Sequence, residues 1–237
     1  MKKFELTSEF VTFLGKKLFR IKALISFGNV EEGELGGYVE KEENLSNDGN
    51  AWVYGNARVS GDAWVSGDAR VFGDAEVFGD AEVFGNAWVY GNAWVSGDAR
   101  VCGNAWVFGD AEVFGNAWVY GNARVSGDAR VFGDARVFGD ARVFGDAEVF
   151  GDARVFGNAR VFGNADYATV HGFGSEYRTT TFFRTKAGDI GVRCGCFYGT
   201  LEEFRAKVKE THRETKTAKE YLMVADLMEF RFSKEEV

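Results

Sequence analysis

The hexad Gly49-Asn50-Ala51-Trp52-Val53-Tyr54 is the first of twenty that follow one another without an insertion up to Ala168. They follow the form Gly-(Asp/Asn)-Ala-x-Val-y. A strict period of six with glycine at every turn is typical of a parallel β-helix, in which three hexads make one triangular coil and the coils stack in register. The sequence therefore predicts a rod of about seven coils, counted at three hexads each.

The side chains of each hexad divide between the two faces of a strand. Alternation sends Ala and Val to one face and the x and y residues to the other. Position x holds Arg nine times, Trp six times, Glu four times and Asp once, and such residues cannot face a dry interior at acceptable cost. We therefore expect Ala and Val to line the prism, with Gly and Asp or Asn at its corners. Proline, which cannot donate to the strand ladder, is absent from the chain.

The chain divides into three parts: residues 1–48, 49–168 and 169–237. The first part should form a β cap, with strands around Phe10–Leu14 and Leu18–Ile25 joined by Gly15-Lys16-Lys17. Val39 and Leu45 precede Ala51 by multiples of six residues, which indicates that the first coil begins before the perfect hexads. A cap is needed because an open coil presents unpaired backbone groups that invite end-to-end polymerisation.

The third part should be a small α+β unit. Arg178–Phe183 and Ile190–Phe197 are expected to form a hairpin around Lys186–Asp189. Two helices should follow, because Thr200-x-x-Glu203 and Thr217-x-x-Glu220 both have the spacing of a capping box and precede apolar stripes.

Over the hexad array, about half of its length, the chain resembles the hexapeptide-repeat proteins with a left-handed parallel β-helix. In that family an aliphatic residue and a small residue four positions later point inward, as Val53 and Ala57 would here. With Leu35–Glu40 and Glu43–Ser46 before the array, the chain looks more like the long uninterrupted arrays of bacterial and prophage type than like the catalytic acyltransferases. The resemblance implies left-handed winding and a role carried by a mobile element.

Residues eighteen apart should stack on neighbouring coils, so the x residues form three columns. The first column runs Trp52, Arg70, Trp88, Trp106, Arg124, Arg142, Arg160. The second, Arg58 to Asp166, largely alternates in charge and is expected to be a solvated salt ladder. Trp and Arg are enriched in interface hot spots, so the first column is the predicted protein-binding face, with Trp52, Trp88, Trp106, Arg124, Arg142 and Arg160 as contact residues. The alternative is that these side chains only shield the strands and stack on one another.

The y position is aromatic in fourteen hexads and adds aromatic columns at the corners. If these rings lie outside the prism, two explanations are open. Either they pack laterally, as a homo-oligomer or against a partner, or they stack on one another along the corner.

Residues with catalytic or metal chemistry are few. The hexapeptide acyltransferases use a histidine beside a cleft between subunits, but the array holds no His, and the chain has only His171 and His212. Together with Cys194 and Cys196 these are candidate zinc ligands. The alternative is that both cysteines are buried core thiols, on one hairpin face with Ile190 and Val192. The resulting hypothesis is a noncatalytic module without a cofactor, and the rival is an acyltransferase or metal-dependent enzyme using the C-terminal unit.

Charge and hydropathy limit the partners. A net charge of −8 disfavours binding to nucleic acid or to a membrane surface. Corner Asp and Asn suggest calcium binding or DNA mimicry, but a simpler explanation is that Asp is only a corner residue beside Arg.

No segment has the length of a membrane span or the pattern of a signal peptide, so we expect a cytoplasmic protein. A phage-encoded inhibitor of a host defence system is one specific form of the binding hypothesis.

Overall fold

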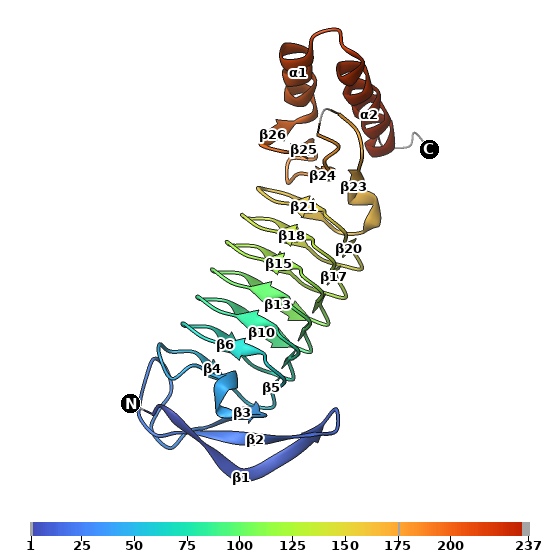
Figure 1. Cartoon of the computed structure of the whole chain (residues 1–237). Coiled ribbons are helices and arrows are strands. Elements are labelled where there is room, and N and C mark those ends of the chain that lie inside the picture. Colours follow the sequence, from blue (N-terminus) through green and yellow to red (C-terminus); the bar gives the residue numbers. More distant parts are fainter. Residues whose placement is uncertain (1, 175, 234–237) are drawn as a thin grey trace.

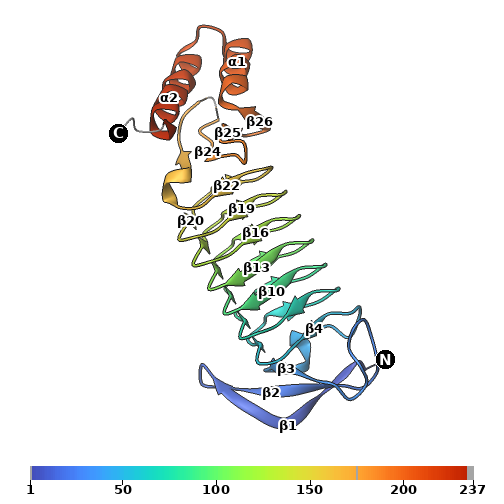
Figure 2. The ribbon, with the colours of Figure 1, turned by 180° about the vertical axis from the view of Figure 1, so that it is seen from behind.

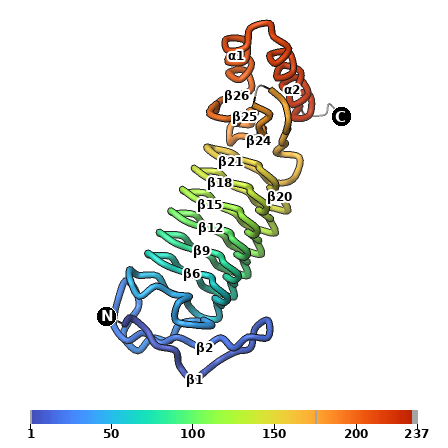
Figure 3. The backbone as a smooth tube through the Cα atoms, viewed as in Figure 1, coloured from blue at the N-terminus to red at the C-terminus, as the bar shows by residue number. Residues whose placement is uncertain are grey.

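The computed structural model describes residues 2–174 and 176–233. The protein is a rod with a β-hairpin across one end and two helices at the other (Figure 1). The backbone tube shows the coils stacked along the rod between these ends (Figure 3). The predicted fold class, a parallel β-solenoid of about seven coils with a β cap and an α+β unit, is confirmed.

Three parallel sheets form the faces of the rod. The first face contains β4 (Trp52–Val53), β7 (Arg70–Val71), β10 (Trp88–Gly91), β13 (Trp106–Gly109), β16 (Arg124–Val125), β19 (Arg142–Val143) and β22 (Arg160–Val161). The second contains β3 (Leu35–Val39), β5 (Arg58–Val59), β8 (Glu76–Val77), β11 (Trp94–Val95), β14 (Glu112–Val113), β17 (Arg130–Val131) and β20 (Glu148–Val149). The third contains β6 (Trp64–Val65), β9 (Glu82–Val83), β12 (Arg100–Val101), β15 (Trp118–Val119), β18 (Arg136–Val137) and β21 (Arg154–Val155).

The interior of the rod consists of the alanines and valines of the hexads. From Ala51 to Val161 every one of them is at most 1% exposed. Each buried valine contributes on the order of 1.5 kcal/mol or more. Neighbouring coils are joined by backbone bonds such as Trp88 N to Ala105 O, 2.9 Å. The inward assignment of Ala and Val is therefore confirmed.

The corners depend on glycine for two reasons. Gly97 has a φ of +66°, a region that residues with a side chain rarely adopt. A Cβ on Gly97 would also lie only 3.0 Å from the backbone nitrogen of Gly115 on the next coil. Beside the glycines, Asn side chains donate to the next coil, as from Asn104 Nδ2 to Asn122 Oδ1 at 3.2 Å. The corner residues thus bind the coils together as well as turning the chain.

The N-terminal cap is a hairpin that extends the second face. Strand β1 (Phe4–Phe13) pairs with β2 (Lys16–Ala23), which pairs with β3. The turn is Leu14-Gly15, with φ of 48° and 78°, rather than the expected Gly15-Lys16-Lys17. Positive φ at both central residues is the geometry of a type I′ two-residue turn, whose twist matches that of the flanking strands.

The first coil begins at β3, before the regular hexads, as expected, but its register differs from theirs. Val39 pairs with Val59 and Leu45 with Val65, at a spacing of twenty residues rather than eighteen. The two extra residues lie between Leu45 and Val53, which are eight residues apart, and not in the 3-10 helix η1 (Glu42–Asn44), which falls within the regular six-residue step from Val39 to Leu45. Val39 and Leu45 therefore continue the valine columns and not the alanine columns.

The last regular coil ends at β22, and the middle of the twentieth hexad forms the 3-10 helix η2 (Asn164–Asp166). An antiparallel sheet follows, in the order β23 (Tyr167–Val170), β24 (Thr180–Arg184), β25 (Ile190–Cys194) and β26 (Phe197–Thr200). The predicted hairpin is β24–β25; the outer strands β23 and β26 were not predicted.

Helices α1 (Leu201–His212) and α2 (Lys216–Phe232) complete the C-terminal unit. The capping box of Thr200 and Glu203 is present, with Thr200 Oγ1 accepting from Glu203 N. The expected cap at Thr217 is wrong, because α2 begins two residues earlier and Thr215 Oγ1 accepts from Ala218 N. The buried stripes of both helices form one core with Phe182 and Val192 of the sheet.

The two ends of the rod are capped by groups of opposite hydrogen-bonding character. Each coil donates N–H groups to the carbonyls of the next, so the first coil is left with free carbonyls and the last with free N–H groups. Lys3 Nζ donates to Ala51 O and Asn44 Nδ2 to Ala63 O at the first end. Asn164 Oδ1 accepts from Glu148 N and Thr181 Oγ1 from Arg154 N at the other. Both caps therefore satisfy backbone groups that would otherwise be buried unpaired.

Candidate functional site

The first face carries a continuous strip of indole and guanidinium groups. We define the Trp–Arg strip as Arg70, Trp88, Trp106, Arg124, Arg142 and Arg160. The strand register confirms the predicted column, since each residue pairs with the next one eighteen positions later. The view from behind shows its strands β10, β13, β16, β19 and β22 stacked along the rod (Figure 2). At a strand spacing of about 4.8 Å, the strip is roughly 24 Å long.

The centre of the strip is a stacked pair of tryptophans. The rings of Trp88 and Trp106 have centroids 5.2 Å apart and planes inclined by 5°. The Arg70 guanidinium lies 5.3 Å from the Trp88 ring, and that of Arg124 lies 4.5 Å from the Trp106 ring. Each outer face of the pair is thus covered by a cation, a favourable arrangement for the electron-rich ring.

The corner beside the strip holds the tryptophans in place. Phe72, Tyr90 and Phe108 stack with centroids 4.7 and 4.9 Å apart. Phe72 meets Trp88 edge-on at 5.8 Å, and Tyr90 meets Trp106 at 6.4 Å. Of the two explanations for the aromatic corners, self-stacking is therefore the one observed, and it makes the strip rigid. The homo-oligomer stays a prediction.

The far half of the strip is three consecutive arginines, Arg124, Arg142 and Arg160. Within residues 2–174 and 176–233, none of them forms an ion pair. Arg160 donates from Nη1 to the backbone carbonyl of Asp140 at 3.1 Å. Desolvation, followed by the charge of Arg142, lowers the pKa of Arg160. This half of the strip is a positive surface on an acidic protein, and it offers donors to an external acceptor.

One predicted contact residue is not on the surface. Trp52 is 0% exposed, because the cap covers the start of the first face. Its ring lies 5.4 Å from that of Phe27 and 6.2 Å from that of Phe4. The expectation of an exposed Trp52 is therefore wrong. Arg70 was missing from the predicted contact residues, although its place in the column was a sufficient signal.

The other two faces have no stacked pair of tryptophans among the described residues, although Trp118 on the third face lies between the guanidiniums of Arg100 and Arg136, at 5.1 and 5.3 Å. On the second face Arg58 lies 2.8 Å from Glu76, and Arg130 lies 3.0 and 3.4 Å from Glu112 and Glu148. The predicted salt ladder is thus confirmed, except that Glu76 is buried rather than solvated and that Asp166 lies in η2 and not in the column. Two tryptophans outside the strip, Trp64 and Trp94, are 44% and 46% exposed. Trp64 pairs with Glu82, and Trp94 pairs with Glu76 and Glu112, whereas the strip pairs its tryptophans with each other.

The four candidate zinc ligands lie in the C-terminal unit and are divided between two cavities. Cys194, Cys196 and His212 line one cavity of about 270 Å³, while His171 and Cys196 line another of about 460 Å³. Among the described residues no group of three or more His, Cys, Asp or Glu side chains is arranged to hold a metal. The expectation that both thiols are buried is wrong, because Cys196 lies after β25 in a turn at Gly195 and is exposed.

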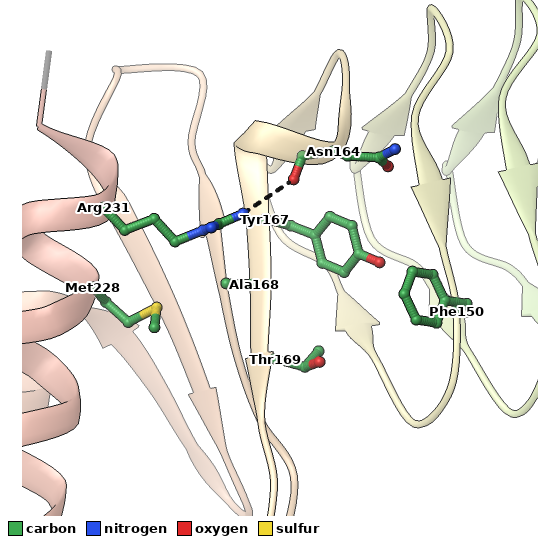
Figure 4. Close-up of a pocket in the computed structure, with 7 residues that line it drawn as sticks. All are labelled: Phe150, Asn164, Tyr167, Ala168, Thr169, Met228 and Arg231. Carbon is green, nitrogen blue, oxygen red and sulfur yellow. Dashed lines mark hydrogen bonds between the residues drawn. The ribbon is translucent and has the colours of Figure 1, made fainter. Parts of the chain in front are cut away.

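A further cavity of about 480 Å³ lies between the last coil and α2 (Figure 4). Phe150 and Tyr167 form one side, and Met228 and Arg231 of α2 form the other. Arg231 donates from Nη2 to the backbone carbonyl of Asn164 at 3.5 Å. Burial raises the pKa of Tyr167 to about 12, so its phenol stays protonated near neutral pH. Arg231 and Met228 thus place α2 beside the residues that follow the last coil.

No helix in the described part of the chain is long and apolar enough to cross a membrane.

Comparison with known families finds a match to the YdcK beta solenoid repeat at residues 51–67, 117–133 and 123–137. A search of curated proteins finds no match. The matched segments all lie within the coils described above, and the chain is accordingly a β-solenoid repeat protein.

Proposed function

We propose that the protein is a noncatalytic binding module that presents the Trp–Arg strip to a protein partner. The observation that carries this proposal is the stacked Trp88–Trp106 pair followed by three arginines without an ion pair in the described structure. Trp and Arg are the side chains most enriched at interface hot spots. A partner would place an apolar patch over the indoles and carboxylates opposite the guanidiniums.

The rigidity of the strip supports binding rather than mere shielding of the strands. The tryptophans are fixed by one another and by the Phe72–Tyr90–Phe108 stack, so little side-chain entropy remains to be lost on association. A flat strip of this kind suits a protein surface better than a small molecule, which requires a concave pocket.

The chemistry of the strip favours a noncatalytic role. Guanidinium groups remain protonated at all physiological pH values, and an indole only donates a hydrogen bond. Such groups bind anions and apolar surfaces but do not exchange protons with a substrate near neutral pH. The proposal therefore places the activity in association alone.

We further propose that the protein acts in the cytoplasm for a phage or other mobile element, with inhibition of a host defence protein as one form of this role. This part rests on the likeness of Leu35–Glu40, Glu43–Ser46 and the uninterrupted array to bacterial and prophage proteins. Because the arginines of the strip favour an acidic partner surface, we expect the target to be a host protein with an exposed acidic patch.

The test is affinity capture from host lysate with mass spectrometry, using the wild type, W88A/W106A and W94A. Trp94 is the matched control, because it is an exposed tryptophan on another face. We expect the same partner with the wild type and W94A, and its loss with W88A/W106A. Equal capture by all three proteins would contradict the assignment of the strip.

A further inference from the structure

A second cluster of positive charge lies where the β-helix meets the C-terminal unit. The cavity of about 460 Å³ at this junction is lined by the three arginines Arg154, Arg178 and Arg193. They come from three segments: β21 of the last coils, the chain before β24, and β25. Asp152 is the only carboxylate in the lining, so the cavity is positive in a chain of net charge −8.

Arg193 is held from two sides. Its guanidinium lies 5.1 Å from the Phe156 ring, and its Nη1 donates to the Cys196 carbonyl at 3.4 Å. Its Nε is buried and has no hydrogen-bond partner within the described residues. A buried donor without an acceptor is costly, and the two contacts fix the guanidinium at the wall of the cavity.

The turn between β25 and β26 lets Arg178 lie against Gly195. Gly195 has a φ of +55°, and a Cβ at this position would lie 3.0 Å from Arg178 Nη1. Arg178 has one exposed carboxylate nearby, Glu176 at 3.5 Å, and such exposed pairs are weak. Glycine at 195 thus leaves room for the Arg178 guanidinium beside the turn, in the cavity that Arg193 also lines.

Arg154 completes the cluster from the rod. Its backbone N–H is fixed by Thr181 Oγ1 at 3.0 Å. Its side chain is exposed and makes no ion pair in the part of the chain that the structure describes. The guanidinium therefore remains available to the cavity.

A chain of polar groups lies beside the arginines. Thr179 Oγ1 lies 3.5 Å from Asp152 Oδ2 and 3.0 Å from His171 Nδ1. When Thr179 donates to Asp152, its oxygen accepts a hydrogen bond from His171 Nδ1. The imidazole is then oriented by Nδ1, and its Nε2 is left for another contact.

We propose that this cavity binds the phosphate groups of a small organic polyphosphate. Three guanidiniums against one carboxylate match a ligand with at least two negative charges, and the forked guanidinium suits phosphate oxygens. The volume is within the range of small-molecule sites, about 300–1,000 Å³. A single carboxylate would leave most of the positive charge unmatched. This site is separate from the Trp–Arg strip and does not depend on the proposed partner.

The proposal is tested by isothermal titration of the full chain with inorganic pyrophosphate, adenosine triphosphate, adenosine and citrate at 150 mM salt, which screens nonspecific attraction. We expect saturable binding of one pyrophosphate or adenosine triphosphate per chain, no binding of adenosine, and citrate weaker by about tenfold or more, a difference of ~1.4 kcal/mol. Arg154→Gln and Arg193→Lys should each weaken pyrophosphate binding by about tenfold, the second because lysine keeps the charge but loses the fork.

Arg136→Gln is the matched control, because Arg136 is the preceding exposed arginine of the same column and stacks on Trp118 at 5.3 Å, outside the cavity. It should leave pyrophosphate binding unchanged, and circular dichroism should confirm the fold of each variant. Failure of pyrophosphate to bind the wild type would overturn the proposal. Equal losses in R136Q and R154Q, or citrate binding as tightly as pyrophosphate, would do the same.

Discussion

The ammonium nitrogen of Lys3 lies 2.9 Å from the carbonyl oxygen of Ala51 and closes the open end of the first coil. The side chain is buried, and the Phe27 ring lies 4.7 Å from the same nitrogen. Desolvation lowers the pKa of Lys3 from 10.5 to about 8. Burial in the cap therefore disfavours the charged form of Lys3. The same burial places its ammonium group where it donates to the Ala51 carbonyl, which no strand N–H reaches.

This arrangement predicts a pH dependence of stability. Between pH 8 and 10.5 the unfolded chain keeps the Lys3 proton while the folded chain releases it, so the contribution of Lys3 to the free energy of unfolding should rise with pH across this window. Lys3→Met should remove that rise. Urea unfolding at several pH values from 7 to 10 would measure it, with the exposed Lys2→Met as control. A difference between wild type and K3M that is constant with pH would contradict the account.

The inward position of valine predicts a severe effect of a buried charge. Val107 is 0% exposed, so Val107→Asp would bury a carboxylate without a partner. We expect a loss of more than about 4 kcal/mol and the end of cooperative unfolding. Trp106→Ala, next to it but facing outward, should keep the melting transition. An unchanged melt of V107D would show that the faces are assigned the wrong way round.

The corner glycines allow strain and crowding to be separated. Gly97→Ala should cause both backbone strain and crowding, because the φ of Gly97 is +66° and the Gly115 nitrogen lies 3.0 Å from the new Cβ. Gly15→Ala should cause backbone strain alone, since the φ of Gly15 is +78° and no atom lies within 4 Å of the new Cβ. We expect about 1–2 kcal/mol for G15A and a larger loss for G97A in chemical denaturation. Equal losses would mean that the coils are not closely packed at this corner.

The asparagine ladder should be sensitive to loss of its donor. Asn104→Asp removes the bond to Asn122 Oδ1 and brings two oxygens together where the structure has a 3.2 Å contact. We expect a loss of about 0.5–1.5 kcal/mol. Asn158→Asp is the control in the same corner column, because the Asn158 side chain makes no hydrogen bond within the described residues. Similar thermal shifts for both variants would argue against the ladder.

The regular part of this fold could be predicted because each hexad encodes its own geometry. Gly97 turns a corner, Val107 packs in the interior and Trp106 faces outward. Each position follows from the place of the residue within its hexad and from the stacking of the next coil. The column of the strip followed from the eighteen-residue spacing in the same way. Local rules were sufficient for the inner hexads, from β5 to β22.

The ends could not be predicted so well, because contacts distant in sequence decide them. Trp52 has the same hexad context as Trp88, but the folded-back cap buries it. Val39 pairs twenty residues away because two extra residues between Leu45 and Val53 lengthen the first coil. The arginines around the junction cavity come from segments up to 39 residues apart, Arg154 to Arg193, and no local pattern links them.

The most direct test of the central claim is oxidative footprinting of the six tryptophans in the captured complex. The account predicts that Trp88 and Trp106 become protected when the partner binds, while Trp64, Trp94 and Trp118 react as in the free protein and Trp52 is protected in both. Protection of Trp64 or Trp94 with Trp88 and Trp106 unchanged would show that the partner binds another face.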